Sequence, residues 1–302
     1  MVEFKGSVLR VFDPWRSPLC TCPFKYSLHP YTGCSHFCLY CYAASYIGRK
    51  PSTPKKEFIE RLRRDLKRVK PGSIIEMSTS SDPYPPIEAS LMLTRRTVEL
   101  LGEHGSRILV TTKSNLVVRD ADLLAEYPSS VMITITTLDE DLARLIEPGA
   151  PPPSVRLEAV RILMEKGVPV GVRVDPVIPY VNSDPEELRR LVKTVRDAGA
   201  LQVTTSSFKA RWDSLSRLTS ALPEDTALKL RRLYTERGER IHGYMYLPEE
   251  LRRTLLEPVI SEAIRSGLYI ATCREGIGIL KAPSCDGSGL IMFHPAVQHH
   301  YK

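Results

Sequence analysis

The stretch YTGCSHFCLYCY at residues 31–42 organises this chain, because it gathers three of the seven cysteines within eight residues. Cys34, Cys38 and Cys41 are separated by four and three positions, and no fourth cysteine lies nearby. This spacing suits three thiolates that converge on one metal centre. The stretch therefore predicts an iron-sulfur cluster with one iron left open for chemistry, and we interpret the rest of the chain as a scaffold around that iron.

The composition is that of an ordinary globular protein. The chain has 302 residues, of which 42% are hydrophobic and 25% are charged, and no apolar run approaches the roughly 18 residues of a membrane helix. The first residues lack the apolar core and cleavage site of a signal peptide, so we expect a cytoplasmic protein with no membrane segment. In that reducing compartment, closely spaced cysteines indicate metal or redox use rather than a disulfide framework.

The net charge of +7 leaves two interpretations open. An excess of Lys and Arg is typical of proteins that bind a polyanion such as a nucleic acid. It is also typical of the charge-dense, solvated surface of a thermophile protein. Because the basic residues are dispersed rather than clustered, charge alone does not decide between them.

Strand and helix patterns alternate from residue 24 to about residue 206. Apolar strand-like runs lie at 24–28, 73–77, 107–111, 131–136, 170–174 and 201–205. Helical spacing of apolar residues separates them, as in the stretch that begins with Asp184, Pro185, Glu186 and Glu187. Parallel strands need such crossover helices, so the pattern predicts an α/β fold with a parallel, barrel-like sheet of about six strand-helix units.

The pattern changes beyond residue 208. Helical spacing is found at 223–237 and 247–264, one more strand-like run at 268–272, and a tail rich in Pro, Gly and Ser from residue 281. We therefore expect an N-terminal extension at 1–23, a barrel at 24–210, and a C-terminal helical extension at 211–302 that closes one side of the barrel.

Polar residues follow several of the predicted strands. In a parallel α/β barrel, the loops after the strands line the functional face, and the cysteine loop has that position. We expect His36, within this loop, to be solvated. Side chains predicted on the same rim include Asp82, Lys113, Thr134, Arg173, Asp175 and residues 204–207.

At this point the sequence resembles a known superfamily. The pattern Cys34-x3-Cys38-x2-Cys41, with an aromatic residue before the last cysteine, is similar to the signature of the radical S-adenosylmethionine (radical SAM) enzymes. Further segments resemble its spore photoproduct lyase-like branch: LHPYTG at 28–33, SSDPY at 80–84, LTR at 93–95, TKS at 112–114, EPGAP at 147–151 and PVIP at 176–179. The resemblance implies a partial TIM barrel, a 4Fe-4S cluster and S-adenosylmethionine bound to its open iron.

The resemblance also implies residues that hold S-adenosylmethionine. Ser81, Lys113 and Thr134 match positions at its methionine end, where the cation of Lys113 suits a carboxylate. For Ser81 and Thr134, hydrogen bonds within strand ends or turns are the alternative. Tyr40 and Tyr42 border the last cysteine and are included in this group. Arg156 is included too, with an internal ion pair to Glu147 as its alternative.

The chain departs from the lyase itself in the segment at 79–82. The lyase carries a hydrogen-donating cysteine in this segment, whereas this chain has Thr79 and no cysteine there. A hydroxyl is a far poorer hydrogen-atom donor than a thiol. We therefore expect an enzyme of the lyase-like branch that is not the lyase.

Four cysteines remain outside the cluster motif. Cys20 and Cys22 precede the predicted barrel, and Cys273 and Cys285 follow it, so the two ends could meet and form a second site. A second iron-sulfur cluster, a zinc site and a thiol radical relay through Cys273 and Cys285 are the interpretations, with free buried cysteines as the alternative. Tyr84 is a further candidate for the relay.

Two hypotheses for the whole protein follow. In the first, the enzyme cleaves S-adenosylmethionine to a 5′-deoxyadenosyl radical that abstracts hydrogen from a substrate, for which a nucleic acid, a peptide and a small metabolite are candidates. A ferredoxin- or flavodoxin-type reductant would supply the electron. In the second, an iron-sulfur protein binds nucleic acid or transfers electrons without radical catalysis. The polar rim and Lys113 favour the first, since a structural cluster does not need them.

Overall fold

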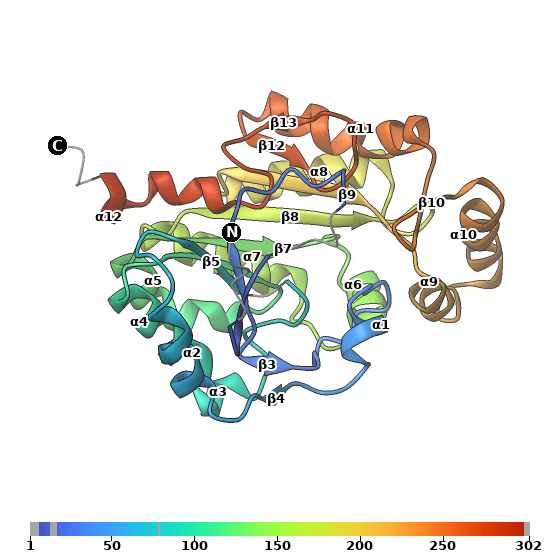
Figure 1. Cartoon of the computed structure of the whole chain (residues 1–302). Helices are drawn as coiled ribbons and strands as arrows, with labels where there is room; N and C mark the ends of the chain where they lie inside the picture. Colours follow the sequence, from blue (N-terminus) through green and yellow to red (C-terminus); the bar gives the residue numbers. More distant parts are fainter. Residues whose placement is uncertain (1–5, 13–16, 78, 299–302) are drawn as a thin grey trace.

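A computed structural model describes residues 6–12, 17–77 and 79–298, and in these residues nine strands form one sheet (Figure 1). Its order is β1-β2-β5-β6-β7-β8-β9-β12-β13. The neighbours from β2 to β12 are all parallel, while β1 and β13 pair antiparallel at the two edges. The strands are β1 (Leu9–Val11), β2 (Tyr26–Leu28), β5 (Ile74–Met77), β6 (Arg107–Thr112), β7 (Ser129–Thr134), β8 (Val170–Val177), β9 (Gln202–Ser207), β12 (Tyr269–Thr272) and β13 (Leu280–Lys281).

Helices connect the strands and cover the outer face of the sheet. Two short strand pairs, β3 (Tyr31–Thr32) with β4 (Thr53–Pro54) and β10 (Glu239–Ile241) with β11 (Tyr244–Tyr246), lie outside it. The helices are α1 (Ala44–Ile47), α2 (Phe58–Leu66), α3 (Glu88–Leu91), α4 (Leu93–Glu103), η1 (Asn115–Asp120), α5 (Ala121–Glu126), α6 (Glu140–Ile146), α7 (Pro153–Glu165), α8 (Pro185–Asp197), α9 (Trp212–Thr219), α10 (Glu224–Arg237), α11 (Glu249–Arg265), η2 (Ser288–Phe293) and α12 (Pro295–Gln298).

The local sequence explains where these helices begin. At α8, the Asp184 side chain accepts hydrogen bonds from the backbone N–H groups of Glu186 and Glu187, each at 3.0 Å, and Pro185 occupies the first turn. Asp139 caps α6 in the same way. The start at Asp184 agrees with the predicted one.

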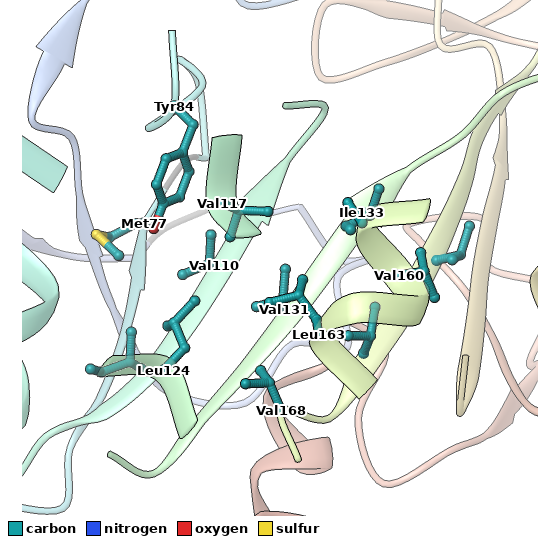
Figure 2. Packing of buried hydrophobic residues seen from close by; sticks show 14 of the residues in the cluster. Met77, Tyr84, Val110, Val117, Leu124, Val131, Ile133, Val160, Leu163 and Val168 are labelled. Carbon is teal, nitrogen blue, oxygen red and sulfur yellow. The ribbon is translucent and has the colours of Figure 1, made fainter. Parts of the chain in front are cut away.

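The main hydrophobic core lies between the sheet and its helices. Val110 of β6 and Val131 of β7 point toward this layer, where Val160 and Leu163 of α7 complete the packing (Figure 2). Alternation along each strand sends the intervening side chains to the opposite, inner face. There Leu109 and Met132 pack against Leu290 of η2, so the C-terminal segment fills part of the inner face.

The predicted α/β partial barrel is confirmed. All six predicted strands exist, and the run at 268–272 is a seventh parallel strand, paired with β9. Strand β1 was not predicted, and it places part of the N-terminal segment on the edge beside β2. The boundaries at 23/24 and 210/211 stay predictions, although both flanking segments supply strands to the sheet.

Candidate active site

The cysteine loop follows β2 and β3 and is held by backbone contacts from two other segments. The Cys34 N–H donates to Lys50 O at 2.9 Å, and the Leu39 N–H donates to Ile146 O at 2.8 Å. The Gly149 N–H donates to His36 O at 2.9 Å, so close that a Cβ at Gly149 would lie 2.0 Å from Ser35 O. The loop between α6 and α7 therefore braces the cysteine loop from behind.

The three cysteines of the loop border a cavity of about 840 Å³ at the carboxyl ends of the strands. Burial raises the pKa of Cys34 and of Cys38, so both thiols stay protonated near neutral pH unless a metal replaces the proton. In the described part of the chain, no three His, Cys, Asp or Glu side chains already meet at metal-binding distances. The fit to a cluster therefore rests on the donor set, which is three thiols facing one cavity, with a cationic side chain next to Cys38.

That cation is Lys113, from the loop after β6. Its Nζ lies 5.5 Å from the centre of the Tyr40 ring, and it lines the same cavity. Burial lowers the pKa of Lys113, but the nearby Cys38, in its thiolate form, and Glu147 raise it by more, so the ammonium form persists. A fixed positive charge beside three thiols suits an anionic ligand such as a carboxylate.

Asp82 positions the segment that carries Lys113. Its carboxylate accepts the Thr112 hydroxyl at 2.7 Å and the Lys113 backbone N–H at 2.8 Å. It also lies 3.4 Å from Nδ1 of His36. The prediction that His36 is solvated is wrong, because the fold closes Asp82 over the loop and His36 is buried.

Arg156 and Glu147 form an internal ion pair behind the cysteine loop. Their closest atoms are 2.5 Å apart, and both side chains are buried. The Tyr40 hydroxyl and the Thr136 hydroxyl both donate to Glu147. Burial raises the pKa of Glu147, but Arg156 and then Lys113 lower it by more. Arg156 was predicted either to contact the cofactor or to pair with Glu147. The structure contains the ion pair, and Arg156 is not among the residues that line the cavity.

The other predicted cofactor residues differ in their surroundings. Ser81 and Thr134 line the cavity, and the Ser81 hydroxyl also donates to Tyr31 O at 3.1 Å. Tyr42 lines it too, and its hydroxyl donates to Thr79 O at 3.2 Å. Tyr84, predicted as a relay, has its side chain buried in the core near Met77 and Val117 (Figure 2), and it is not among the residues that line the cavity, although its backbone N–H donates to Asp82, which is.

All seven cysteines of the chain line this one cavity. Cys273 directly follows β12, and Cys285 lies on the inner face of the sheet, where it is 2% exposed. Cys20 and Cys22 reach the same space from the segment after β1. The structure thus brings together the four outer cysteines, which the sequence placed at opposite ends of the chain.

The far wall of the cavity carries an ion pair between predicted rim residues. Arg173 and Asp175 of β8 are paired, and the Ser206 hydroxyl donates to Asp175. Burial raises the pKa of Asp175, but Arg173 and then Lys209 lower it to about 2. This carboxylate is therefore ionised at any physiological pH.

Sequence reasoning missed two further buried charge groups of this wall. Lys25 pairs with Glu76 at 2.7 Å and with Asp286, and Lys209 pairs with Glu275 at 2.6 Å. One feature of the sequence could have pointed to the first group, because Glu76 places a charge within the apolar run of β5. Its partners come from distant segments, which the sequence pattern does not connect.

Fold and site together define a class: an α/β barrel-like protein with three closely spaced cysteines lining a cavity at the carboxyl edge of its parallel sheet. The model of the radical SAM superfamily matches residues 28–195, so the chain belongs to this superfamily. The predicted radical SAM superfamily is confirmed, and the protein is a radical SAM enzyme.

The relatives span a wide range of sources. An uncharacterized protein of Mycobacterium tuberculosis is 31% identical over 78% of this chain and 73% of its own. An uncharacterized protein of Acidianus two-tailed virus is also 31% identical, over 70% of this chain and 78% of its own. Spore photoproduct lyase, solved with a dinucleoside spore photoproduct, shares the fold with a TM-score of 0.62 at 18% identity, over 82% of this chain and 76% of the lyase.

Within residues 6–12, 17–77 and 79–298, no helix combines enough length with enough apolar character to cross a membrane.

Proposed function

We propose that this enzyme binds a 4Fe-4S cluster through Cys34, Cys38 and Cys41 and uses it to cleave S-adenosylmethionine reductively. The observation that carries the proposal is the shared cavity, in which these three thiols and the Lys113 ammonium face the same space. When bound, the cluster and S-adenosylmethionine supply a one-electron cleavage that gives methionine and a 5′-deoxyadenosyl radical, which takes hydrogen from the substrate.

The residues of the chain would fix the cosubstrate in place. Lys113 has the charge to bind its carboxylate, and Asp82 holds the backbone of Lys113 in position. Ser81 and Thr134 offer hydroxyl groups to the same cavity. Arg156 would act indirectly, by orienting Glu147 and through it Tyr40.

For the substrate, we favour a molecule that joins an anionic group to a planar ring, as a nucleotide in a nucleic acid does. The far wall supports this choice. Arg274 lines the cavity and lies 5.4 Å from the ring centre of Tyr42 and 5.3 Å from that of Tyr244. Cations beside aromatic rings suit phosphates and stacked bases. A base within a duplex would have to leave its stack to reach this depth.

A protein reductant of ferredoxin or flavodoxin type is part of the proposal, because the chemistry consumes an electron. A cytoplasmic location is proposed with it, since free cysteines and an iron-sulfur cluster suit a reducing compartment.

The test is anaerobic reconstitution with iron and sulfide, followed by dithionite and S-adenosylmethionine. We expect 5′-deoxyadenosine and methionine from the intact protein, and neither above background from the Cys34→Ala, Cys38→Ala, Cys41→Ala variant. A Ser27→Ala variant is the matched control, because Ser27 lines the cavity and bears no thiol. If the reconstituted protein takes up a cluster yet forms neither product, the electron-transfer or nucleic-acid-binding hypothesis replaces the enzyme.

Binding to nucleic acid has its own test. We expect single-stranded oligonucleotides to bind with an affinity that falls as salt rises, measured by fluorescence anisotropy. Replacing Arg274 with Gln should weaken that binding. Binding to tRNA and DNA that is absent, or unaffected by salt, would instead point to a peptide or small-metabolite substrate.

A further inference from the structure

The four cysteines outside the cluster motif converge on the inner face of the sheet. The sulfur atoms of Cys22 and Cys285 are 3.5 Å apart, although 263 positions separate the two residues in the chain. The Cys20 thiol lies within hydrogen-bond reach of the Cys22 thiol, and Cys273 lines the same cavity. Four thiols from two ends of the chain therefore line one cavity, and those of Cys22 and Cys285 are in direct contact.

The segments that carry these thiols are fastened in place by buried contacts. Lys25, three residues after Cys22, forms an ion pair with Asp286, the neighbour of Cys285. The Thr204 hydroxyl donates to Cys285 O at 2.9 Å, which fixes that backbone against β9. The Cys273 N–H donates to Thr205 O at 2.9 Å. Such fixed backbones leave only side-chain rotation to bring the thiols onto a common ligand.

The Cys22 and Cys285 sulfurs stand at the distance of a thiol–thiol hydrogen bond, and the same spacing suits two ligands of one metal atom. Two thiolates on one tetrahedral metal atom, with metal–sulfur bonds of about 2.3 Å, lie about 3.8 Å apart. The observed 3.5 Å is close to that value and well beyond a disulfide bond, and all four cysteines are free. In a reducing compartment, four such thiols are more typical of a metal centre than of a disulfide pair.

We propose that Cys20, Cys22, Cys273 and Cys285 bind a second, thiolate-ligated metal centre, in which Cys22 and Cys285 share one metal atom. Cys20 and Cys273 complete the ligand set, either on the same atom, as in a zinc site, or on the second iron of a two-iron cluster. The centre lies in the same cavity as the radical SAM cysteines but uses none of them, so it goes beyond the proposed function.

In the described residues, no three His, Cys, Asp or Glu side chains already meet at metal-binding distances, either among these four cysteines or at the cluster motif. Both proposed sites therefore need the thiol side chains to rotate onto the metal.

The test uses the full chain with Cys34, Cys38 and Cys41 replaced by Ala, which removes the radical SAM cluster. This variant is loaded anaerobically with zinc chloride, or with ferrous iron and sulfide, then desalted and analysed for bound metal and acid-labile sulfide. We expect about one zinc atom, or two iron atoms with sulfide, per chain. Adding Cys22→Ser and Cys285→Ser should abolish retention, whereas adding Ser27→Ala should leave it unchanged.

A second measurement does not depend on a variant that folds. In the metal-loaded protein, Cys20, Cys22, Cys273 and Cys285 should resist alkylation by iodoacetamide, and a chelator should restore their reactivity, as mapped by mass spectrometry. Equal alkylation with and without metal would overturn the proposal and leave free thiols, as a radical relay requires. Metal retention that persists without Cys22 and Cys285 would overturn it too. Neither result depends on S-adenosylmethionine cleavage, so the two proposals can fail separately.

Discussion

Lys113 is the residue on which the binding of S-adenosylmethionine should depend most. Its ammonium is kept charged by Cys38 and Glu147 against the effect of burial. Replacing it with Met keeps the bulk and removes the charge, and a hydrogen-bonded ion pair of this kind contributes about 1.5–3 kcal/mol. We therefore expect S-adenosylmethionine to bind about 10- to 100-fold more weakly to Lys113→Met, with iron content unchanged, by equilibrium dialysis of the reconstituted protein.

Lys113→Arg serves as the control for this prediction. Arg keeps the positive charge, so part of the affinity should return if charge is what the ligand needs. A variant Lys113→Met that binds S-adenosylmethionine as tightly as the intact protein would remove Lys113 from the binding site.

At the same scale, sequence reasoning succeeded where local spacing carries the chemistry and failed where a distant partner does. That the three motif cysteines, Lys113 and Thr134 line one cavity could be predicted, because each belongs to a strand end or a short motif, while their roles there stay predictions. The burial of His36 could not, because it depends on Asp82, a residue 46 positions away that the fold brings to 3.4 Å. Lys25 escaped notice for the same reason, since its partner Asp286 lies near the other end of the chain.

At the scale of elements, the strands and longer helices followed from apolar periodicity and turn residues. Strand β1 did not, because its three residues are too few for a period to be visible. The contact between the α6–α7 loop and the cysteine loop was also invisible. EPGAP at 147–151 reads as a local turn, whereas its glycine is needed for a close approach of two loops.

Gly149 offers a test of that approach. A Cβ at this position would lie 2.0 Å from Ser35 O, too near for any relaxed backbone, so Gly149→Ala should displace the cysteine loop. We expect a lower yield of cluster on reconstitution, read from iron content and visible absorbance. Gly72→Ala is the control for backbone strain without a clash, because its φ is +80° while a Cβ there meets nothing within 4 Å, so it should lower stability and leave cluster uptake unchanged. Full cluster uptake by Gly149→Ala would mean that the loop tolerates the shift.

Asp65, in helix α2, accepts hydrogen bonds from the segment that leads into strand β1, and the stability that these bonds contribute should depend on pH. Its carboxylate, in a side chain only 5% exposed, accepts the backbone N–H groups of Ser7, Val8 and Leu9 at 2.8–3.0 Å. Burial raises the pKa of Asp65, but these hydrogen bonds lower it by more, so the folded pKa lies below the unfolded value. We expect Asp65→Asn to lose about 2 kcal/mol of unfolding free energy at pH 7.

The sign of the pH effect follows from that lowered pKa. A group with a depressed folded pKa contributes its full stability above the unfolded pKa, about 3.9 for Asp, and loses it as pH falls through the folded pKa. Urea unfolding of the intact protein and Asp65→Asn should therefore differ by a constant amount between about pH 7 and 5, and by less below about pH 4. A difference that grows on acidification would contradict the assignment.

At the scale of the whole molecule, the sheet leaves its inner face to be filled by other parts of the chain. Strands supply the polar wall of the cavity toward their carboxyl ends, while η2 covers the inner face nearer their amino ends, through Leu290 against Leu109 and Met132. Figure 1 has α12 at the end of the molecule opposite to α9 and α10. The C-terminal segment at 284–293, called the plug below, thus covers the inner face of the sheet and also places Cys285 and Asp286 at the cavity.

This arrangement predicts that one apolar contact in η2 affects both stability and the cavity. Leu290 is fully buried against Leu109 and Met132, so Leu290→Ala leaves a cavity and should cost about 3 kcal/mol of unfolding free energy. Met292, in the same helix, is 56% exposed, and Met292→Ala should cost less than about 0.5 kcal/mol. Urea unfolding measures both.

Because the plug holds the Cys285 backbone, Cys285 in the metal-free protein should react faster with iodoacetamide in Leu290→Ala than in the intact protein, and at an unchanged rate in Met292→Ala. Equal losses of unfolding free energy in the two variants would mean that the contact of Leu290 with Leu109 and Met132 does not stabilise the fold, and would contradict the prediction.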